Sequence, residues 1–502
     1  MQRRETEMLK IQNKILREQD KFWCGCVFHP TDAIEDPWGK RILDQMAQDK
    51  AIDTVRIYSM FEDIVYSDAE GKLCYDFRLS DLRLDYMLER GYSLVIAYAG
   101  IPDCIAASTD NKCSIAKGKT RYKGKMWNTS PPRDYALWEE ICYEYTKHNI
   151  ERYGIETVSK WKCQCFNEPD VKSFWLSELD PHDNEPRLKE YCKLYEYFQR
   201  GVRRASEDIL VGGPAFGGMG GIKEFFGGFL KYVKANDLKL DFVTEHKYSV
   251  GFHMVRDKKG FIDVGSMIQT HEEIEETVCE NGFGDLPIIM DEWGMITHGF
   301  CNIEECPDMM CRETEVFSAF YVRMIRRFLD CANPPKELMI CLSGQHEMEQ
   351  DFTGFRNFFT LNFIKKPIYN AHVMAGRLKE KLICADVEDE NISLIPTTDG
   401  NGNYSVLLSY SADNGDINLP DKTEQVVFAD DVSGKTVTVF CIDRENTNPY
   451  RLFEREKMTV PDKEQIFALR REGDLKPMIV QSGSEPLELR LTANCTYLIS
   501  VE

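Results

Sequence analysis

The sequence predicts a (β/α)8 barrel followed by a smaller antiparallel β-sandwich domain. Short apolar runs alternate with amphipathic helical stretches from residue 21 to 375, and the hydrophobic pattern changes to period two from residue 376. The runs are nearly continuous in apolar residues, as in strands that helices cover on both faces. Eight runs are candidates for the barrel strands, at residues 22–28, 54–59, 93–98, 158–166, 209–213, 241–246, 286–291 and 337–342.

Helices are expected between most of these strands. One helical face recurs at steps of three and four residues and comprises Leu188, Tyr191, Tyr195, Phe198, Val202 and Ala205. Another helix is predicted to begin at Asp134, a plausible N-cap, and to stop at Gly154. A doubly wound sheet is the alternative, but no Gly-rich dinucleotide loop follows the first strand.

Residues 376–502 alternate apolar and polar side chains, as at Tyr404, Val406, Leu408 and Tyr410, with turn clusters at 399–402 and 414–415. This pattern is typical of antiparallel strands and predicts an accessory β-sandwich domain. Residues 1–20 form a charged arm of alternating sign, for which we expect a solvated helix. An oligomer contact is the alternative for this arm.

The composition excludes several classes of partner. The chain has 502 residues, with 62 Lys and Arg against 83 Asp and Glu, and a net charge of −21. Such an acidic protein is poorly suited to bind nucleic acid or an anionic membrane. The first twenty residues contain no apolar export segment, so the 18 cysteines are expected to be reduced thiols in a cytoplasmic protein.

Two carboxylates follow predicted barrel strands. Glu168 lies in Asn167-Glu168-Pro169 after the fourth strand, and Glu292 lies in Asp291-Glu292-Trp293 after the seventh. Carboxyl ends of parallel strands meet at one rim of a barrel, where the active sites of such enzymes lie. Glycosidic bond cleavage needs one protonated and one ionised carboxyl group across a cleft. A lone acidic residue after a strand is usually a solvated loop residue or an N-cap, but this pair at these two positions favours catalysis.

The chain resembles glycoside hydrolase family 39, within the clan of retaining (β/α)8 glycosidases that carry acid/base and nucleophile after strands four and seven. The likeness runs from about residue 20 to the C-terminus. Motifs that match in order and spacing lie at residues 130–135, 151–154, 167–169, 211–215, 246–248, 365–367 and 442–450.

The resemblance implies a role for each matching residue. Glu168 is expected to be the general acid/base and Glu292 the nucleophile of a double displacement. Asn167 is expected to bond the sugar 2-hydroxyl, His246 to line the same subsite, and Tyr248 to donate to Glu292 and hold it ionised.

Substrate contacts are also expected from Trp293, beside the nucleophile, and from Glu347, which follows the eighth strand with Gln345 and His346. A plain solvated loop is the alternative for residues 345–347. The chain departs from the family pattern at Arg56-Ile57-Tyr58-Ser59, at Phe166 where Trp is commoner, and at the eighth strand, which lacks the aromatic residue that usually floors the sugar subsite.

No metal or cofactor is expected. His298, Cys301, Cys306 and Cys311 cluster after Glu292, but their five-residue spacing is unlike that of structural zinc sites. The cysteine pairs 24/26 and 163/165 are on one face of a strand and are interpreted as barrel packing.

The sequence therefore predicts an exo-acting retaining glycoside hydrolase that releases a non-reducing-end sugar from a short oligosaccharide. The family's default is β-D-xylose from xylo-oligosaccharides; an iduronide, galactoside or arabinoside, or a transglycosylase reaction, fits the same machinery. An inactive carbohydrate-binding barrel is the alternative from a different class, and a homo-oligomer is possible.

Overall fold

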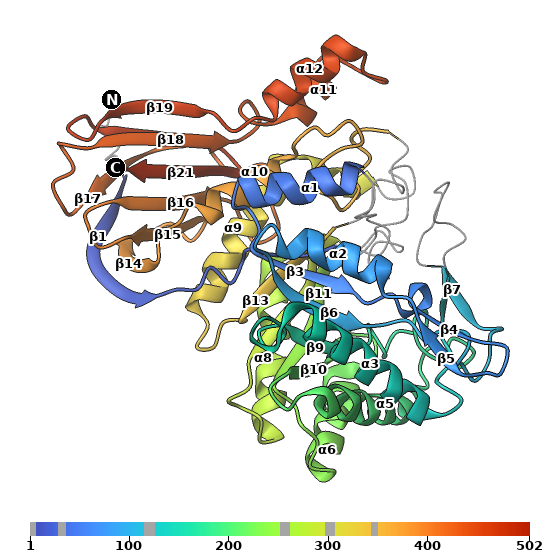
Figure 1. Cartoon of the computed structure of the whole chain (residues 1–502). Coiled ribbons are helices and arrows are strands. Elements are labelled where there is room, and N and C mark those ends of the chain that lie inside the picture. The colour runs from blue at the N-terminus through green and yellow to red at the C-terminus, as the bar shows by residue number, and fades with distance from the viewer. Residues whose placement is uncertain (1–6, 29–36, 115–125, 251–261, 297–306, 343–349) are drawn as a thin grey trace.

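The computed structural model shows a parallel β-barrel surrounded by helices, packed beside a second, mostly antiparallel β domain (Figure 1). It describes residues 7–28, 37–114, 126–250, 262–296, 307–342 and 350–502. None of the helices in these ranges is long and apolar enough to cross a membrane.

Eight parallel strands close into a barrel, as the sequence predicts. Their order around the ring is β10-β11-β12-β13-β2-β3-β6-β9, and the pairing of β13 with β2 closes it. Closure excludes the doubly wound alternative, which has open edges. The strands are β2 (Gly25–Val27), β3 (Thr54–Tyr58), β6 (Ser93–Tyr98), β9 (Lys162–Cys165), β10 (Leu210–Phe216), β11 (Phe242–Val250), β12 (Ile288–Ile296) and β13 (Glu337–Cys341).

Helices cover the outside of the ring. The Asp134 carboxylate accepts a hydrogen bond of 2.9 Å from the Ala136 N–H and so caps α3, and Gly154 follows at φ 82°. Both helix ends lie where the sequence predicts them. The main helices are α1 (Pro37–Gln48), α2 (Arg78–Leu88), α3 (Tyr135–Tyr153), α5 (Asn184–Ala205), α6 (Gly227–Ala235), α8 (Val264–Glu280), α9 (Glu315–Asp330) and α10 (Pro367–Gly376).

Short elements occupy the connections of the barrel. Two small hairpins pair β4 (Val65–Ser67) with β5 (Leu73–Tyr75), and β7 (Lys112–Ser114) with β8 (Met126–Asn128). The short helices are η1 (Phe61–Asp63), α4 (Ile155–Val158), η2 (Gly221–Phe226) and η3 (Pro307–Glu313).

The second domain is a nine-stranded sheet of order β19-β18-β21-β16-β15-β14-β1-β17-β20. Its pairs are antiparallel except β1 with β17, which run parallel. Helices α11 (Pro449–Arg455) and α12 (Lys463–Glu472) project from it (Figure 1). The strands are β1 (Glu7–Glu18), β14 (Lys381–Asp386), β15 (Ile392–Thr398), β16 (Tyr404–Tyr410), β17 (Lys422–Phe428), β18 (Thr436–Ile442), β19 (Pro477–Ser482), β20 (Leu487–Leu491) and β21 (Cys495–Val501).

The expectation of a solvated helix for the N-terminal arm is wrong. Residues Glu7–Glu18 form β1, a long curved strand that pairs with β14 on one side and β17 on the other. Leu9 and Ile11 are buried in the core of the β domain, whereas Ile15 and Leu16 are about half exposed. The arm therefore belongs to the β domain, although the rest of that domain lies at the opposite end of the sequence.

This placement predicts unequal effects for two isoleucines of one strand. Ile11 is 1% exposed and Ile15 is 48% exposed. Ile11→Ala should lower the free energy of unfolding by about 2–5 kcal/mol, because it leaves a cavity in a packed core. Ile15→Ala should change it by less than about 0.5 kcal/mol. Chemical denaturation of the two variants measures both values, and equal small effects would contradict a buried β1.

Ion pairs join α9 to the β domain. Glu315, at the first position of α9, is fully buried and pairs with Arg451 Nη2 at 2.8 Å. Further along the helix, Arg323 and Arg327 both bind Asp413. A buried carboxylate is tolerated only when it is paired, so the contact between Glu315 and Arg451 helps to fix how the two domains pack.

Candidate active site

The two predicted carboxylates emerge from β9 and β12 at the same rim of the barrel. Glu168 follows β9 at φ 46°, and its backbone N–H donates to the carbonyl oxygen of Ala215, at the end of β10, at 3.0 Å. Glu292 lies within β12, opposite His246 of the neighbouring strand β11. The strands thus bring together residues 124 positions apart in the sequence.

His246 bridges the two glutamates. One ligand atom from each of Glu168, His246 and Glu292 can be chosen so that all three lie within 4.8 Å of one another. The His246 Nδ1 is 2.8 Å from Glu168 Oε1 and 3.8 Å from Glu292 Oε2, and its Nε2 is 3.4 Å from Asp291 Oδ2. The carboxyl oxygens are therefore about as close as those of retaining glycosidases, about 5–5.5 Å, and nearer than the ~6.5–9.5 Å of inverting enzymes.

Arg56 of β3 lies beneath this pair and is completely buried. Its Nε is 2.9 Å from Asp291 Oδ2, its Nη2 donates to Asn167 Oδ1 at 2.9 Å, and its Nη1 is 3.5 Å from Glu292 Oε2. Gln164 of β9 also donates to Asp291, at 2.5 Å. One guanidinium thus fixes three polar groups of the site, which a planar fork of donors suits.

The carboxylate of Glu292 is held from its other side by Tyr248 of β11. The Tyr248 hydroxyl donates to Glu292 Oε1 at 2.5 Å and accepts a hydrogen bond from Arg356 Nη1 at 2.7 Å. Arg356 Nη1 is itself 4.0 Å from Glu292 Oε1. Glu292 is therefore surrounded by donors and positive charge.

The environments of the two carboxyl groups shift their pKa values in opposite directions. Burial raises the pKa of Glu168, and the hydrogen bond from His246 offsets only part of that rise. Burial alone would also raise the pKa of Glu292, but His246, Arg356 and Arg56 lower it to about 2. At neutral pH Glu292 is ionised, and Glu168 is the group more readily protonated, which is the division of labour that acid–base catalysis at a glycoside requires.

His246 completes this charge arrangement as an imidazolium. Burial would lower its pKa, but Asp291 and Glu292 raise it to about 10. An imidazolium donates from both ring nitrogens, which matches Glu168 at Nδ1 and Asp291 at Nε2, and it has no lone pair for a metal ion. Within the described ranges Glu168, His246 and Glu292 are the group whose spacing could hold a cation, but this protonation favours proton chemistry there.

The family model for glycosyl hydrolases family 39 matches residues 8–483, which is most of the chain. The chain belongs to glycosyl hydrolase family 39. The resemblance on which the sequence analysis relied is thereby confirmed, and the protein is a glycoside hydrolase.

The chain is also similar to individual proteins. It is 26% identical over 500 residues to a β-xylosidase of Caldicellulosiruptor saccharolyticus, covering 96% of this chain and 95% of that one. An α-L-iduronidase of Mus musculus is 22% identical over 251 residues, 47% of this chain and 34% of its own. The crystal structure of a monomeric β-xylosidase from Caulobacter crescentus CB15 superposes with a TM-score of 0.82 at 19% identity, covering 99% of both chains; this likeness shows the shared fold.

The structure brings together most of the predicted site residues of this family 39 chain. Asn167, Glu168, His246, Tyr248 and Glu292 form one connected cluster. Their chemical roles stay predictions.

Of the two other predicted substrate contacts, Trp293 lies outside that cluster and Glu347 lies outside the described residues. The side chain of Trp293 is completely buried, and its ring stacks at 5.7 Å on Tyr321 of α9. Trp293 is therefore a packing residue between barrel and helix, whereas the preceding Asp291 and Glu292 both face the polar cluster inside the barrel. Glu347 and the neighbouring Gln345 and His346 lie outside the described residues, as do Cys301 and Cys306 of the cysteine cluster.

Four polar residues of the site escaped the sequence analysis in this role: Arg56, Gln164, Asp291 and Arg356. A signal existed for Arg56 and Asp291, because a charge inside an apolar strand must find a partner at the barrel interior. Arg356 lies in a connection far from any strand, and its sequence neighbourhood carries no comparable signal.

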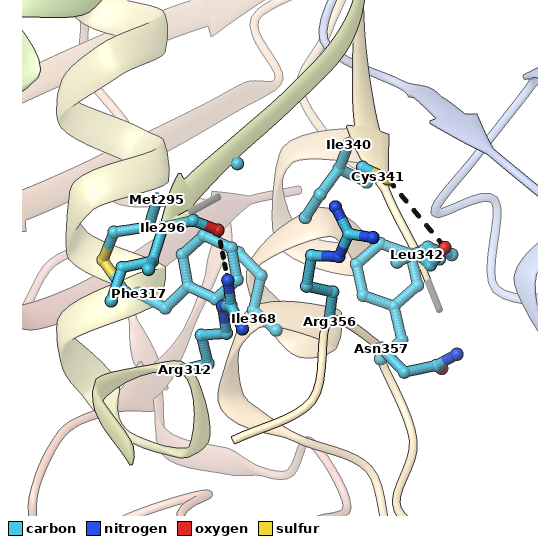
Figure 2. Close-up of a pocket in the computed structure, with 12 residues that line it drawn as sticks. Met295, Ile296, Arg312, Phe317, Ile340, Cys341, Leu342, Arg356, Asn357 and Ile368 are labelled. Carbon is cyan, nitrogen blue, oxygen red and sulfur yellow. Dashed lines mark hydrogen bonds between the residues drawn. The ribbon is translucent and has the colours of Figure 1, made fainter. Parts of the chain in front are cut away.

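A small pocket opens beside Arg356. Figure 2 shows Arg356 and Arg312 among apolar side chains of β12, β13 and α9, with Cys341 near the Arg356 guanidinium. Cys341 occupies the strand that lacks the usual aromatic floor. The pocket is thus lined by two cationic side chains, Arg312 and Arg356, together with the aromatic rings of Phe317 and Phe358.

Proposed function

We propose that this protein is a retaining exo-β-D-xylosidase that acts by double displacement. The observation that carries the proposal is the pair Glu168 and Glu292, whose carboxyl oxygens approach within 4.8 Å and whose pKa values are shifted apart. Membership of family 39 and two curated β-xylosidase relatives, each 26% identical, support the sugar.

In the first step Glu292 attacks the anomeric carbon while Glu168 gives its proton to the departing glycosidic oxygen. The C–O bond to the aglycone breaks as the bond from the sugar to Glu292 forms. In the second step Glu168 takes a proton from water, the resulting hydroxide attacks the anomeric carbon, and Glu292 leaves. Each step inverts the anomeric carbon, so the product retains the configuration of the substrate.

The neighbouring residues prepare these two groups. Arg56 and Tyr58 both donate to Asn167 Oδ1, which leaves the Nδ2 amide as the group that can donate to the sugar 2-hydroxyl. His246 donates to Glu168 Oε1 and so stabilises the ionised form that the second step needs. Tyr248 keeps Glu292 ionised and oriented.

A screen of 4-nitrophenyl glycosides tests the sugar assignment. The β-D-xyloside should give the highest kcat/KM, and proton NMR of the first product should show the β-anomer. Xylotriose labelled at its reducing end should release unlabelled xylose first. An initial α-anomer would contradict the retaining mechanism, and a preference for another pentoside or hexoside would contradict the sugar.

Arg356 gives one observation in favour of a second substrate class, the α-L-iduronides. Its side chain is 8% exposed and lines the pocket, 4.0 Å from Glu292 Oε1, and a guanidinium binds carboxylates well. The α-L-iduronidase of Mus musculus is also a relative. The ratio of kcat/KM for 4-methylumbelliferyl β-D-xyloside and α-L-iduronide decides between them; we expect the xyloside to be preferred.

Tyr248→Phe tests the electrostatic support of the nucleophile. Removing the hydroxyl should raise the pKa of Glu292 above its value of about 2, so the acid limb of the kcat/KM profile should move to higher pH. A hydrogen bond to a charged group is worth about 1.5–3 kcal/mol, so kcat should fall about 10- to 100-fold. Tyr369→Phe is the control, because Tyr369 donates to the Asp49 carboxylate at 2.6 Å away from the site. An unmoved acid limb in Tyr248→Phe would contradict this role.

We infer that the β domain is a sandwich, because side chains from strands distant in the sheet order, such as Leu9, Val439 and Leu489, share one apolar core.

We also infer a reducing, cytoplasmic location and short glycosides as substrates. The buried free thiols of Cys24, Cys163 and Cys165 in the barrel support this location.

A further inference from the structure

The acid/base residue of the proposed function lies on a strained piece of backbone. Phe166 and Glu168 have φ values of 67° and 46°, and Ala215, whose carbonyl accepts from the Glu168 N–H, has φ 55°. Residues with a Cβ rarely adopt this left-handed conformation, and they keep it only where surrounding contacts enforce it. The ends of β9 and β10 therefore need a contact that holds them in this arrangement.

Asp170 supplies such a contact two residues after Glu168. Its side chain is 1% exposed and accepts three backbone hydrogen bonds from the loop after β10. The N–H of Gly217 donates to Oδ1 at 2.7 Å, and those of Met219 and Gly220 donate to Oδ2 at 2.7 and 3.0 Å. One buried carboxylate thus holds the loop after β10 against the loop that carries the acid/base residue.

The tied loop packs directly on Glu168. A Cβ placed on Gly217 would meet the Glu168 Cγ at 3.1 Å and its Cβ at 3.2 Å, as well as the Val171 Cγ2 at 2.6 Å. The backbone of Gly217 therefore packs closely against the side chain of Glu168. A shift of this loop changes where the Glu168 carboxyl group lies.

We propose that Asp170 is a positioning residue for the acid/base: by holding residues 217–220 against Glu168, it aims the Glu168 carboxyl group at the glycosidic oxygen. Asp170 does not itself touch the substrate. The inference rests on the proposed function, since it requires Glu168 to be the proton donor. It predicts that a change at Asp170 impairs proton transfer and leaves attack by Glu292 intact.

Leaving-group dependence distinguishes this role from general stabilisation of the fold. A phenyl β-D-xyloside needs a proton on its departing oxygen, whereas a 2,4-dinitrophenyl β-D-xyloside departs without one. For Asp170→Asn we expect kcat/KM on the phenyl substrate to fall about 10²-fold, the scale of a 1 Å misplacement of a catalytic group. On the dinitrophenyl substrate kcat/KM should stay near wild type, while kcat and KM fall together because the second step is slowed. Added azide should restore kcat.

Gly217→Ala provides a second variant at the same joint. It removes no hydrogen bond, but its methyl group must displace Glu168 or Val171, so the same selective loss on the phenyl substrate is expected. Asp443→Asn is the matched control in the β domain. Asp443 is also a nearly buried carboxylate that accepts two backbone N–H bonds, from Glu445 and Asn446 at 2.7 Å each. In this control, kcat/KM should change by the same factor on the phenyl and the dinitrophenyl substrates.

Glu168→Ala, measured beside these variants, tests the acid/base role of Glu168 separately from the positioning role of Asp170. If Glu168→Ala shows no leaving-group selectivity, the proposed function is wrong. If it shows selectivity and a folded Asp170→Asn loses both substrates equally, or neither, the positioning role is wrong. Should Asp170→Asn fail to fold, equal losses in Gly217→Ala would overturn the proposal in the same way. Selective loss in Asp170→Asn or Gly217→Ala supports it.

Discussion

Glu292→Gly should lower kcat on aryl β-D-xylosides on the order of 10⁴- to 10⁶-fold, the scale seen when a covalent nucleophile is removed. The effect is large because Glu292 is the group in the cluster that is both ionised at neutral pH and supported by Arg56, Tyr248 and Arg356. Azide should enter the space left by the carboxylate and form the α-xylosyl azide, with inverted configuration. Steady-state kinetics and proton NMR of the azide product give the two readouts.

A second buried glutamate of the barrel provides the control for Glu292→Gly. Glu245 lies on β11, is fully buried and binds His271 Nδ1 at 2.8 Å, outside the catalytic cluster. Glu245→Gln should lower the thermal stability of the protein and leave kcat close to the wild-type value. If Glu292→Gly hydrolyses every active glycoside at the wild-type rate, or gives the β-azide, the nucleophile assignment is wrong.

Glu168→Gln should lower kcat/KM about 10²- to 10⁴-fold on substrates with poor leaving groups, the range of general acid catalysis. The wild-type profile should be bell-shaped. Activity is lost at low pH as Glu292 takes up a proton near its pKa of about 2, and at high pH as Glu168 loses its proton at a pKa that burial raises. Because the amide that replaces the Glu168 carboxyl group cannot ionise, the high-pH limb should disappear in the variant.

The pH profiles of Glu168→Gln and of the wild type are compared on phenyl β-D-xyloside, whose departing oxygen needs a proton. On 2,4-dinitrophenyl β-D-xyloside, which reacts without acid assistance, azide should accelerate turnover of the variant and give the β-xylosyl azide, the opposite anomer from that formed by Glu292→Gly. A high-pH limb that survives unchanged in Glu168→Gln would assign the acid/base to another residue.

The barrel was predictable because its strands are buried on both faces. Continuous apolar runs such as Ser93–Tyr98 are recognisable as buried strands, and the helix over Tyr135–Tyr153 is marked by the Asp134 cap and Gly154. The positions of Glu168 and Glu292 followed from the same reasoning, since parallel strand ends share one rim.

The strand β1 was harder to recognise. Leu9 and Ile11 keep the period of two, but the register shifts between Ile11 and Ile15 and again before Arg17. These irregularities, together with charges spread along the whole segment, leave Ile15 and Leu16 exposed and obscure the alternation. Pairing with β14 and β17, more than 350 positions away, decides the conformation, and no local pattern encodes it.

The polar network around the glutamates depends on contacts between distant strands. Arg56 meets Asp291 across the barrel interior, and Asp170 meets the loop at Gly217, so neither role is visible from one segment. Trp293 shows the converse: its place beside Glu292 suggests a sugar contact, but its side chain packs in the core against Tyr321.

Trapping of the glycosyl-enzyme identifies the residue that forms the covalent bond to the sugar. The protein is incubated with 2,4-dinitrophenyl 2-deoxy-2-fluoro-β-D-xyloside, digested, and its peptides are analysed by mass spectrometry. The predicted result is one fluoroxylosyl group per chain, bound through an ester to Glu292, with Glu168 unmodified. A label on any other residue, or turnover of the reagent with no covalent adduct, would contradict a double displacement through Glu292.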